Sequence, residues 1–81
     1  MKIAEAIAKR IKELLVEKNI TQYRLAKKML IYQQSLSNIM NARQNAANVK
    51  TIFQLCKAFE ISILEFFDSP LFIGNQQLDV D

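Results

Sequence analysis

The chain is poor in the residues on which most catalytic and metal-binding sites depend. Its 81 residues include no histidine, and Cys56 is the single cysteine. The lack of histidine excludes imidazole-based acid–base catalysis and histidine-based metal sites. One cysteine can form neither a Cys-x-x-Cys site nor an internal disulfide. We therefore expect a protein that is not an enzyme and that uses no metal and no cofactor.

Glycine and proline are also scarce, with one of each. Alanine, leucine, isoleucine, lysine and glutamine abound instead, and these residues favour helix over turn-rich β architectures. A length of 81 residues with 51% hydrophobic content suits one domain with a single modest core. The composition therefore predicts an all-α fold.

Long hydrophobic runs are missing as well. No uninterrupted run is longer than residues 29–32, and Glu5, Lys9 and Arg10 interrupt the apolar pattern near the start. Such a pattern predicts neither a membrane-spanning segment nor a signal peptide. We accordingly expect no membrane partner and a cytoplasmic location.

Acidic residues are absent from the middle of the chain. Residues 18–59 contain seven basic side chains and no acidic one, whereas residues 60–81 contain five acidic and no basic ones. The net charge of +3 therefore hides a wholly basic centre. This distribution is typical of a surface that binds a polyanion, although a solvated lysine-rich surface has the same composition.

The apolar periodicity in the first half of the chain predicts three helices. The first covers residues 3–18, where apolar side chains recur every three or four positions. The second covers Gln22–Met29, and Thr21 is a suitable N-cap because its hydroxyl can accept a backbone N–H. The third covers Gln33–Met40 and follows after only three residues.

Two further helices are predicted in the second half, after a polar loop over residues 41–47. Asn48 can cap a helix over Val49–Phe59, and the pair Ser62 and Glu65 forms a capping-box pattern at the start of Ile63–Phe67. The whole is a compact five-helix bundle. On the fourth helix we expect one inward face, made of Val49, Ile52, Phe53, Cys56 and Phe59.

The second and third helices, with their short connection, form a helix-turn-helix. In such a unit the second helix can enter the major groove while the first presents its N-terminus to a phosphate. The third helix has an apolar stripe of Leu36, Ile39 and Met40, and amide and hydroxyl side chains elsewhere. Because Gln and Asn can pair with adenine through two hydrogen bonds, this helix is suited to reading DNA.

Three segments carry a resemblance to a known family. ITQYRLAKKM, YQQSLSNIMNAR and IFQLCKAFEISILEFF resemble, in order and spacing, the helix-turn-helix and closing helices of the Cro/repressor-type (XRE-like) family of phage and bacterial regulators. The resemblance covers residues 7–68, and the QQS triplet is most similar to lambdoid phage repressors whose recognition helix opens with two glutamines. It implies a sequence-specific regulator of transcription that is not an enzyme.

The resemblance also implies roles for particular residues. Gln33, Gln34 and Asn38 are expected to reach base edges. Phosphate contacts or support of the recognition helix are expected from a larger set: Thr21, Gln22, Lys27, Lys28, Tyr32, Ser35, Ser37, Asn41 and Arg43. The implied partner is double-stranded DNA, bound by a homodimer at a pseudo-palindromic operator as in a repressor.

The chain departs from the family pattern at several positions. Leu30, Ala42 and Glu60 stand where glycine is usual, so these positions must adopt left-handed geometry at a cost or take another conformation. Tyr32 replaces the usual Ser or Thr N-cap of the third helix, which removes a side-chain cap worth about 1 kcal/mol.

Residues 69–81 lie beyond the 1–68 DNA-binding domain and form a tail. The alternation around Gly74 suits a small hairpin or a strand that pairs with another chain, whereas Leu71 and Phe72 could simply cover the first and fifth helices. Phe66, Phe67 and Phe72 favour a dimer contact here, because so small a core cannot easily hide them. The alternatives to a repressor are an antitoxin that holds a protein partner through this tail, and a helical protein-interaction module.

Overall fold

The computed structural model describes residues 2–42 and 48–72. The described residues form five helices, α1 (Ile3–Glu17), α2 (Gln22–Met29), α3 (Gln33–Met40), α4 (Val49–Phe59) and α5 (Ile63–Phe67). The described residues include no strand. The all-α prediction is confirmed, and four of the five helices have the predicted bounds, while α1 ends one residue early.

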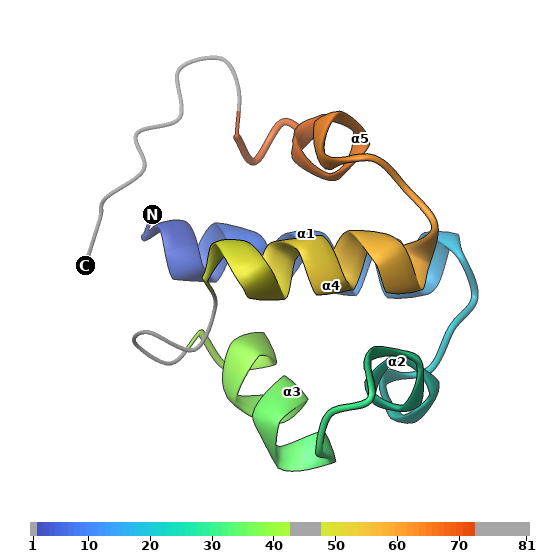
Figure 1. Ribbon diagram of the computed structural model, residues 1–81. Helices are drawn as coiled ribbons and strands as arrows, with labels where there is room; N and C mark the ends of the chain where they lie inside the picture. Colours follow the sequence, from blue (N-terminus) through green and yellow to red (C-terminus); the bar gives the residue numbers. More distant parts are fainter. Residues whose placement is uncertain (1, 43–47, 73–81) are drawn as a thin grey trace.

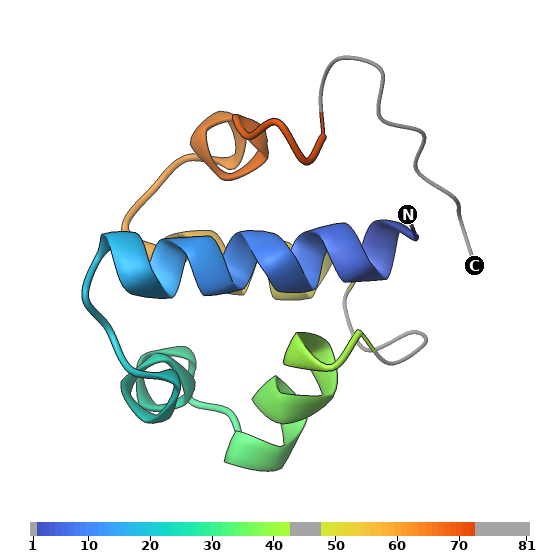
Figure 2. The ribbon, with the colours of Figure 1, turned by 180° about the vertical axis from the view of Figure 1, so that it is seen from behind.

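The helices surround one core. In Figure 1, α4 lies in front of α1, with α5 on one side of them and α2 and α3 on the other, and Figure 2 shows the same arrangement from behind. Every helix contributes at least one large side chain that is fully buried. These side chains are Ile11, Leu14, Leu25, Leu36, Leu55, Phe59 and Phe66. The predicted apolar stripe of α3, Leu36, Ile39 and Met40, is among the core residues.

Three of the helices end in the same way, although none of them ends in glycine. Asn19, Leu30 and Glu60 have φ angles of 53°, 57° and 59°, in the left-handed region. In each case the next residue is an isoleucine whose N–H donates to a carbonyl five residues back, as Ile31 does to Ala26 at 3.1 Å. These isoleucines also pack against the core. Backbone hydrogen bonds and apolar burial therefore offset the cost of left-handed geometry at non-glycine residues.

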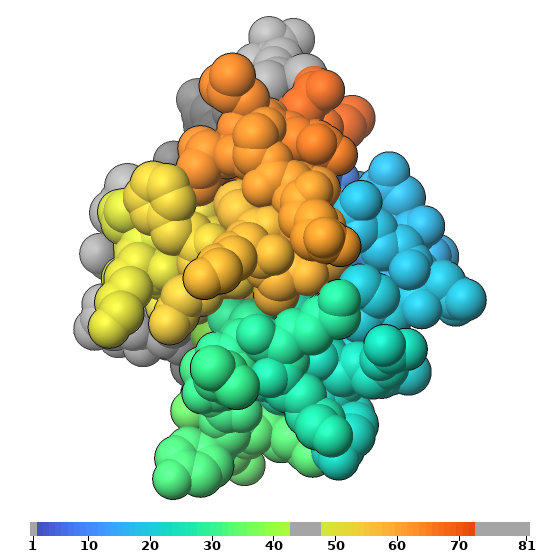
Figure 3. All heavy atoms as spheres, turned by 45° about the vertical axis from the view of Figure 1, so that its right-hand side comes forward, coloured from blue at the N-terminus to red at the C-terminus, as the bar shows by residue number. Residues whose placement is uncertain are grey.

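The inward face predicted for α4 is partly wrong. Ile52, Cys56 and Phe59 are buried as expected, but Val49 is 72% exposed and Phe53 is 59% exposed. Leu55 and Ala58 are buried instead; α2 contacts α4, and Ala58 lies beside Met29 of α2 in a hollow between the two helices. Figure 3 shows α4 and α5 adjoining on one face of the molecule, above α2.

Arg10 is buried, which the sequence did not indicate. Its guanidinium donates from Nε to the Phe66 carbonyl at 2.6 Å and from Nη2 to the Glu65 carbonyl at 2.8 Å. These carbonyls belong to the last turn of α5, where the Glu65 carbonyl also accepts from the Asp68 N–H at 3.2 Å. Nη1 also pairs with the Glu13 carboxylate at 3.2 Å. Arg10 therefore fastens the five-residue helix α5 to α1.

The chain continues to pack against the bundle after α5. Ser69 is buried, and its hydroxyl donates to the Glu13 carboxylate. Phe72 contacts Phe66 and Phe67, with ring centroids 6.4 and 4.9 Å apart, and Phe66 is fully buried. These three aromatic rings therefore pack against one another within one chain. The predicted hairpin or pairing strand of the tail lies in residues 73–81, outside the described residues.

The predicted burial of Cys56 is confirmed. Its side chain is 4% exposed and forms no disulfide, and burial raises the pKa of its thiol. Such a thiol is a packing residue rather than a nucleophile. Over residues 2–42 and 48–72, no group of His, Cys, Asp or Glu could hold a metal ion. No helix in these residues is long and apolar enough to cross a bilayer.

Candidate nucleic-acid interface

The candidate interface is built on α2 and α3, which are in contact and joined by Leu30, Ile31 and Tyr32. Thr21 caps α2 as predicted, because its hydroxyl accepts from the Arg24 N–H at 3.1 Å. The left-handed Leu30 ends α2 and allows the sharp turn into α3. This arrangement is the predicted helix-turn-helix.

The face of α3 that points away from the core is lined with amides and hydroxyls. The Gln34 Nε2 donates to the Asn38 Oδ1 at 3.0 Å, and the Asn41 Nδ2 donates to the Ser37 Oγ at 3.3 Å. Both pairs are four residues apart, so they lie side by side along the helix. The structure thus brings four of the predicted DNA-contacting side chains together on one polar surface.

The remaining predicted residues of α3 flank this surface. Gln33 and Ser35 are exposed in its first turn. Tyr32 is 84% exposed at the N-cap position, and its side chain makes no capping hydrogen bond, as predicted. The first N–H groups of α3 are therefore free of a side-chain cap, and uncapped N–H groups at a helix N-terminus suit a phosphate oxygen.

Basic side chains lie on α2, just before it and on α4. Six basic residues of the predicted basic centre lie in the described part of the chain, and none of them makes an ion pair there. They are Lys18, Arg24, Lys27, Lys28, Lys50 and Lys57. Cations that are not held in ion pairs contribute positive potential to the surface of the molecule. Arg43 lies outside the described residues, so its predicted phosphate contact has no structural description.

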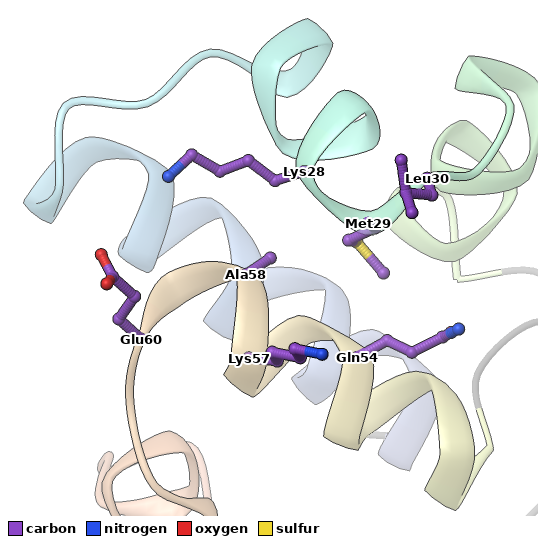
Figure 4. A pocket seen from close by; sticks show the side chains of 7 residues that line it. All are labelled: Lys28, Met29, Leu30, Gln54, Lys57, Ala58 and Glu60. Carbon is purple, nitrogen blue, oxygen red and sulfur yellow. The ribbon is translucent and has the colours of Figure 1, made fainter.

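The two lysines of α2 differ in their surroundings. Lys27 holds its Nζ 5.5 Å from the centre of the Tyr23 ring. Lys28 lines a hollow of about 450 Å³ between α2 and α4, together with Lys57 and Glu60. In Figure 4 the Lys28 side chain points away from α3. Lys27 is thus better placed than Lys28 to contact a nucleic acid that is bound at α3.

Two residues of α2 were not singled out from the sequence. Tyr23 and Arg24 line a shallow depression with Lys27 and Lys28 on the outside of the helix. The four-residue spacing of Tyr23 and Lys27 was the available signal, since it places an aromatic ring beneath a cation on a helix. These side chains extend the basic surface to the N-terminal half of α2.

Comparison with known proteins agrees with this geometry. A family model described as helix-turn-helix matches residues 11–66, and the chain belongs to that family, of the XRE-like type. Comparison with curated proteins finds no match.

Two solved structures are similar to this chain. Prophage Lp1 protein 11 is 27% identical, with a TM-score of 0.79, over 95% of this chain and 100% of that one. A single-residue mutant of the restriction-modification controller protein C.Esp1396I is 27% identical, with a TM-score of 0.75, over 84% and 87% of the two chains. The family and the fold support a DNA-binding regulator of transcription.

Proposed function

We propose that the protein is a sequence-specific repressor that inserts α3 into the major groove of double-stranded DNA. Gln33, Gln34 and Asn38 read base edges in this proposal. The observation that carries it is the hydrogen bond between Gln34 and Asn38 on the exposed face of α3. A bond between two side chains restricts their rotation before any ligand is present, which lowers the ordering cost of binding.

The Gln34 amide can still form hydrogen bonds with a DNA base. Its Oε1 and the second hydrogen on Nε2 are not used by Asn38. An adenine presents N6–H₂ as a donor and N7 as an acceptor in the major groove, which matches these two groups. Asn38 therefore acts as the residue that orients Gln34 and as a neighbour for the adjoining base pair.

The remaining predicted residues supply register and affinity in this proposal. The N-termini of α2 and α3 face phosphates through their free N–H groups, and the hydroxyl, amide and basic side chains around them add contacts. The proposed contributors are Thr21, Gln22, Lys27, Lys28, Tyr32, Ser35, Ser37, Asn41 and Arg43. Such contacts fix orientation on the duplex but carry no sequence information directly.

The proposed assembly is a homodimer on a pseudo-palindromic operator, with half-sites about one helical turn apart. Residues 1–68 form the DNA-binding part and residues 69–81 an accessory tail. Four to eight phosphate contacts per dimer would give a slope of log K against log salt of roughly −4 to −7. Repression follows from occupying the operator, and the protein works in the cytoplasm without catalysis.

A selection of bound duplexes from a random DNA pool tests this function. The wild type and the variant Gln33→Ala/Gln34→Ala are run in parallel at low salt. We expect a two-fold symmetric motif for the wild type and loss or relaxation of that motif for the variant. Failure of the wild type to enrich any motif would refute sequence-specific reading, and an unchanged motif in the variant would refute the assignment to α3.

A further inference from the structure

The hollow between α2 and α4 has the size of a small-molecule site. Its volume is about 450 Å³, within the range of roughly 300–1,000 Å³ that is usual for ligand pockets. Met29 lines it from α2 and Ala58 from α4, and both belong to the buried core. Leu30, which is 91% exposed, lines it from the turn between α2 and α3. The hollow therefore offers apolar surface that a ligand can reach from solvent.

Polar and charged side chains lie at the two ends of this hollow. Figure 4 shows Lys28 and Glu60 at one end and Leu30 and Gln54 at the other. Lys57 is three residues after Gln54, so these two side chains are neighbours on the surface of α4, and the Lys57 ammonium points toward the Gln54 end. The first end combines a cation with an anion. Positive charge is therefore unbalanced only at the end formed by Gln54 and Lys57.

The charged groups of the hollow are available to a ligand. Lys28, Lys57 and Glu60 are exposed and form no ion pair with another described residue. A carboxylate at the end formed by Gln54 and Lys57 would accept from an ammonium and from an amide N–H. A ligand cation would be attracted only by Glu60, at the end where Lys28 repels it. The hollow therefore favours an anion with an apolar body.

We propose that the hollow between α2 and α4 binds a small amphipathic carboxylate that weakens binding to the operator. The carboxylate accepts hydrogen bonds from Lys57 and Gln54. Its apolar chain packs on Met29, Ala58 and Leu30. Binding in the hollow stands by itself, whereas the effect on the operator rests on the proposed function.

The hollow is placed to influence DNA binding because α2 belongs both to it and to the helix-turn-helix. Leu30 ends α2 in left-handed geometry, so a ligand packed on its side chain contacts the turn that sets the direction of α3. The bound carboxylate also neutralises one cation of the basic centre, which lowers the attraction for phosphates. By linkage, the operator and the carboxylate weaken each other's binding by the same factor.

An NMR titration of the ¹⁵N-labelled full chain, without DNA, tests the site. The probes are hexanoate, hexanol and hexylammonium, which share one apolar chain and differ in charge. We expect hexanoate to shift the amide signals of Met29, Leu30, Lys57 and Ala58 with a dissociation constant of roughly 1–10 mM. The other two probes should bind at least about threefold more weakly. No shift of these signals at about 40 mM hexanoate, or equal binding of the three probes, would overturn the proposal.

Matched variants test the two kinds of contact. Lys57→Gln is compared with Lys50→Gln, because both lysines are exposed on α4 and Lys57, unlike Lys50, lines the hollow. Leu30→Ala is compared with Leu64→Ala, since both leucines are exposed and Leu64 lies on α5. The Lys57 and Leu30 variants should raise the dissociation constant of hexanoate by about three- to fivefold, and the controls should leave it unchanged. Equal effects within either pair would contradict the assignment.

An operator titration separates this inference from the function on which its regulatory part rests. Fluorescence anisotropy with the selected duplex is measured with hexanoate and with sodium chloride at the same ionic strength. We expect hexanoate to lower the operator affinity of the wild type at least about threefold, and that of Lys57→Gln less. If the wild type selects no duplex, the proposed function fails and the NMR titration alone decides the site. If hexanoate binds in the hollow without changing operator affinity, the regulatory role is refuted.

Discussion

The exposed faces of α3 and α4 offer opposite chemistry on helices of similar amphipathic character. Outside its buried stripe, α3 presents amides and hydroxyls that are already bonded in pairs, at 3.0 and 3.3 Å. Outside its buried stripe, α4 presents Val49 and Phe53 together with unpaired lysines. Directional hydrogen-bonding groups suit base edges, and apolar area suits another protein surface. Function in this fold therefore depends on what each helix leaves outside the core.

The largest expected effect tests the α3 face. Replacing both glutamines, Gln33→Ala/Gln34→Ala, should weaken binding to the selected operator by about 4 kcal/mol, roughly a thousandfold, because each bidentate pair contributes about 1–3 kcal/mol. Fluorescence anisotropy with labelled duplex measures this loss.

Gln54→Ala is the matched control, since it removes an amide from α4 rather than from α3. It should bind the operator like the wild type. Equal losses for the control and the double variant would remove the distinction between the two faces.

The next effect concerns the attachment of α5 to α1. Arg10→Ala removes two hydrogen bonds to carbonyls at the end of α5, so the free energy of unfolding should fall by about 3 kcal/mol. Urea denaturation measures the change.

Arg24→Ala provides the comparison for Arg10, because Arg24 is exposed on α2 and makes no ion pair in the described chain. Its unfolding free energy should change by less than about 0.5 kcal/mol, as is usual for surface positions. A similar small change in Arg10→Ala would mean that water replaces the carbonyl contacts without loss.

The sequence predicted the helices well because their signals are local. Thr21, Asn48 and Ser62 each accept a backbone N–H three residues on, as expected of N-caps. The sequence left open whether Leu30 and Glu60 adopt left-handed geometry, which they do. The usual preference for glycine gives only the cost of that geometry at another residue. The isoleucine after each of them supplied the missing stabilisation, which is also a local pattern.

Orientation of α4 and burial of Arg10 could not be predicted in the same way. The apolar arc of α4 spans more than half the helix, and only its contact with α2 decides which edge is buried. Arg10 contacts Glu65 and Phe66, which lie 55 and 56 positions further along the chain. The periodicity of α1 therefore could not indicate its partners. Helical spacing predicted that the polar residues of α3 share one face. The hydrogen bond between Gln34 and Asn38 could not be predicted, because it depends on the side-chain conformations.

A smaller effect tests whether Asn38 orients Gln34 on the exposed face of α3. Asn38→Ala removes the acceptor that orients Gln34, so operator affinity should fall by about 1 kcal/mol, the net value of a typical hydrogen bond. Competition titrations against duplexes changed at single positions would show relaxed preference at the base pair read by Gln34. Ser37→Ala, which interrupts the neighbouring pair, should not relax that preference.

The smallest effect concerns an exposed leucine that belongs to neither face. Leu30 has a φ of 57°, and its N–H and that of Ile31 donate to carbonyls in the last turn of α2. Glycine populates this region without a Cβ penalty, so Leu30→Gly should raise the free energy of unfolding by about 0.5–1 kcal/mol in urea denaturation. Operator binding should not change.

Leu64→Gly is the matched opposite of Leu30→Gly. Both leucines are exposed, at 83% and 91%, but Leu64 lies within α5 and has helical geometry. Glycine inside a helix costs about 1 kcal/mol, so the same substitution should destabilise here. Opposite signs at the two positions would show that backbone geometry decides stability at exposed leucines. Destabilisation at both would mean that the Leu30 side chain makes a contribution larger than its strain.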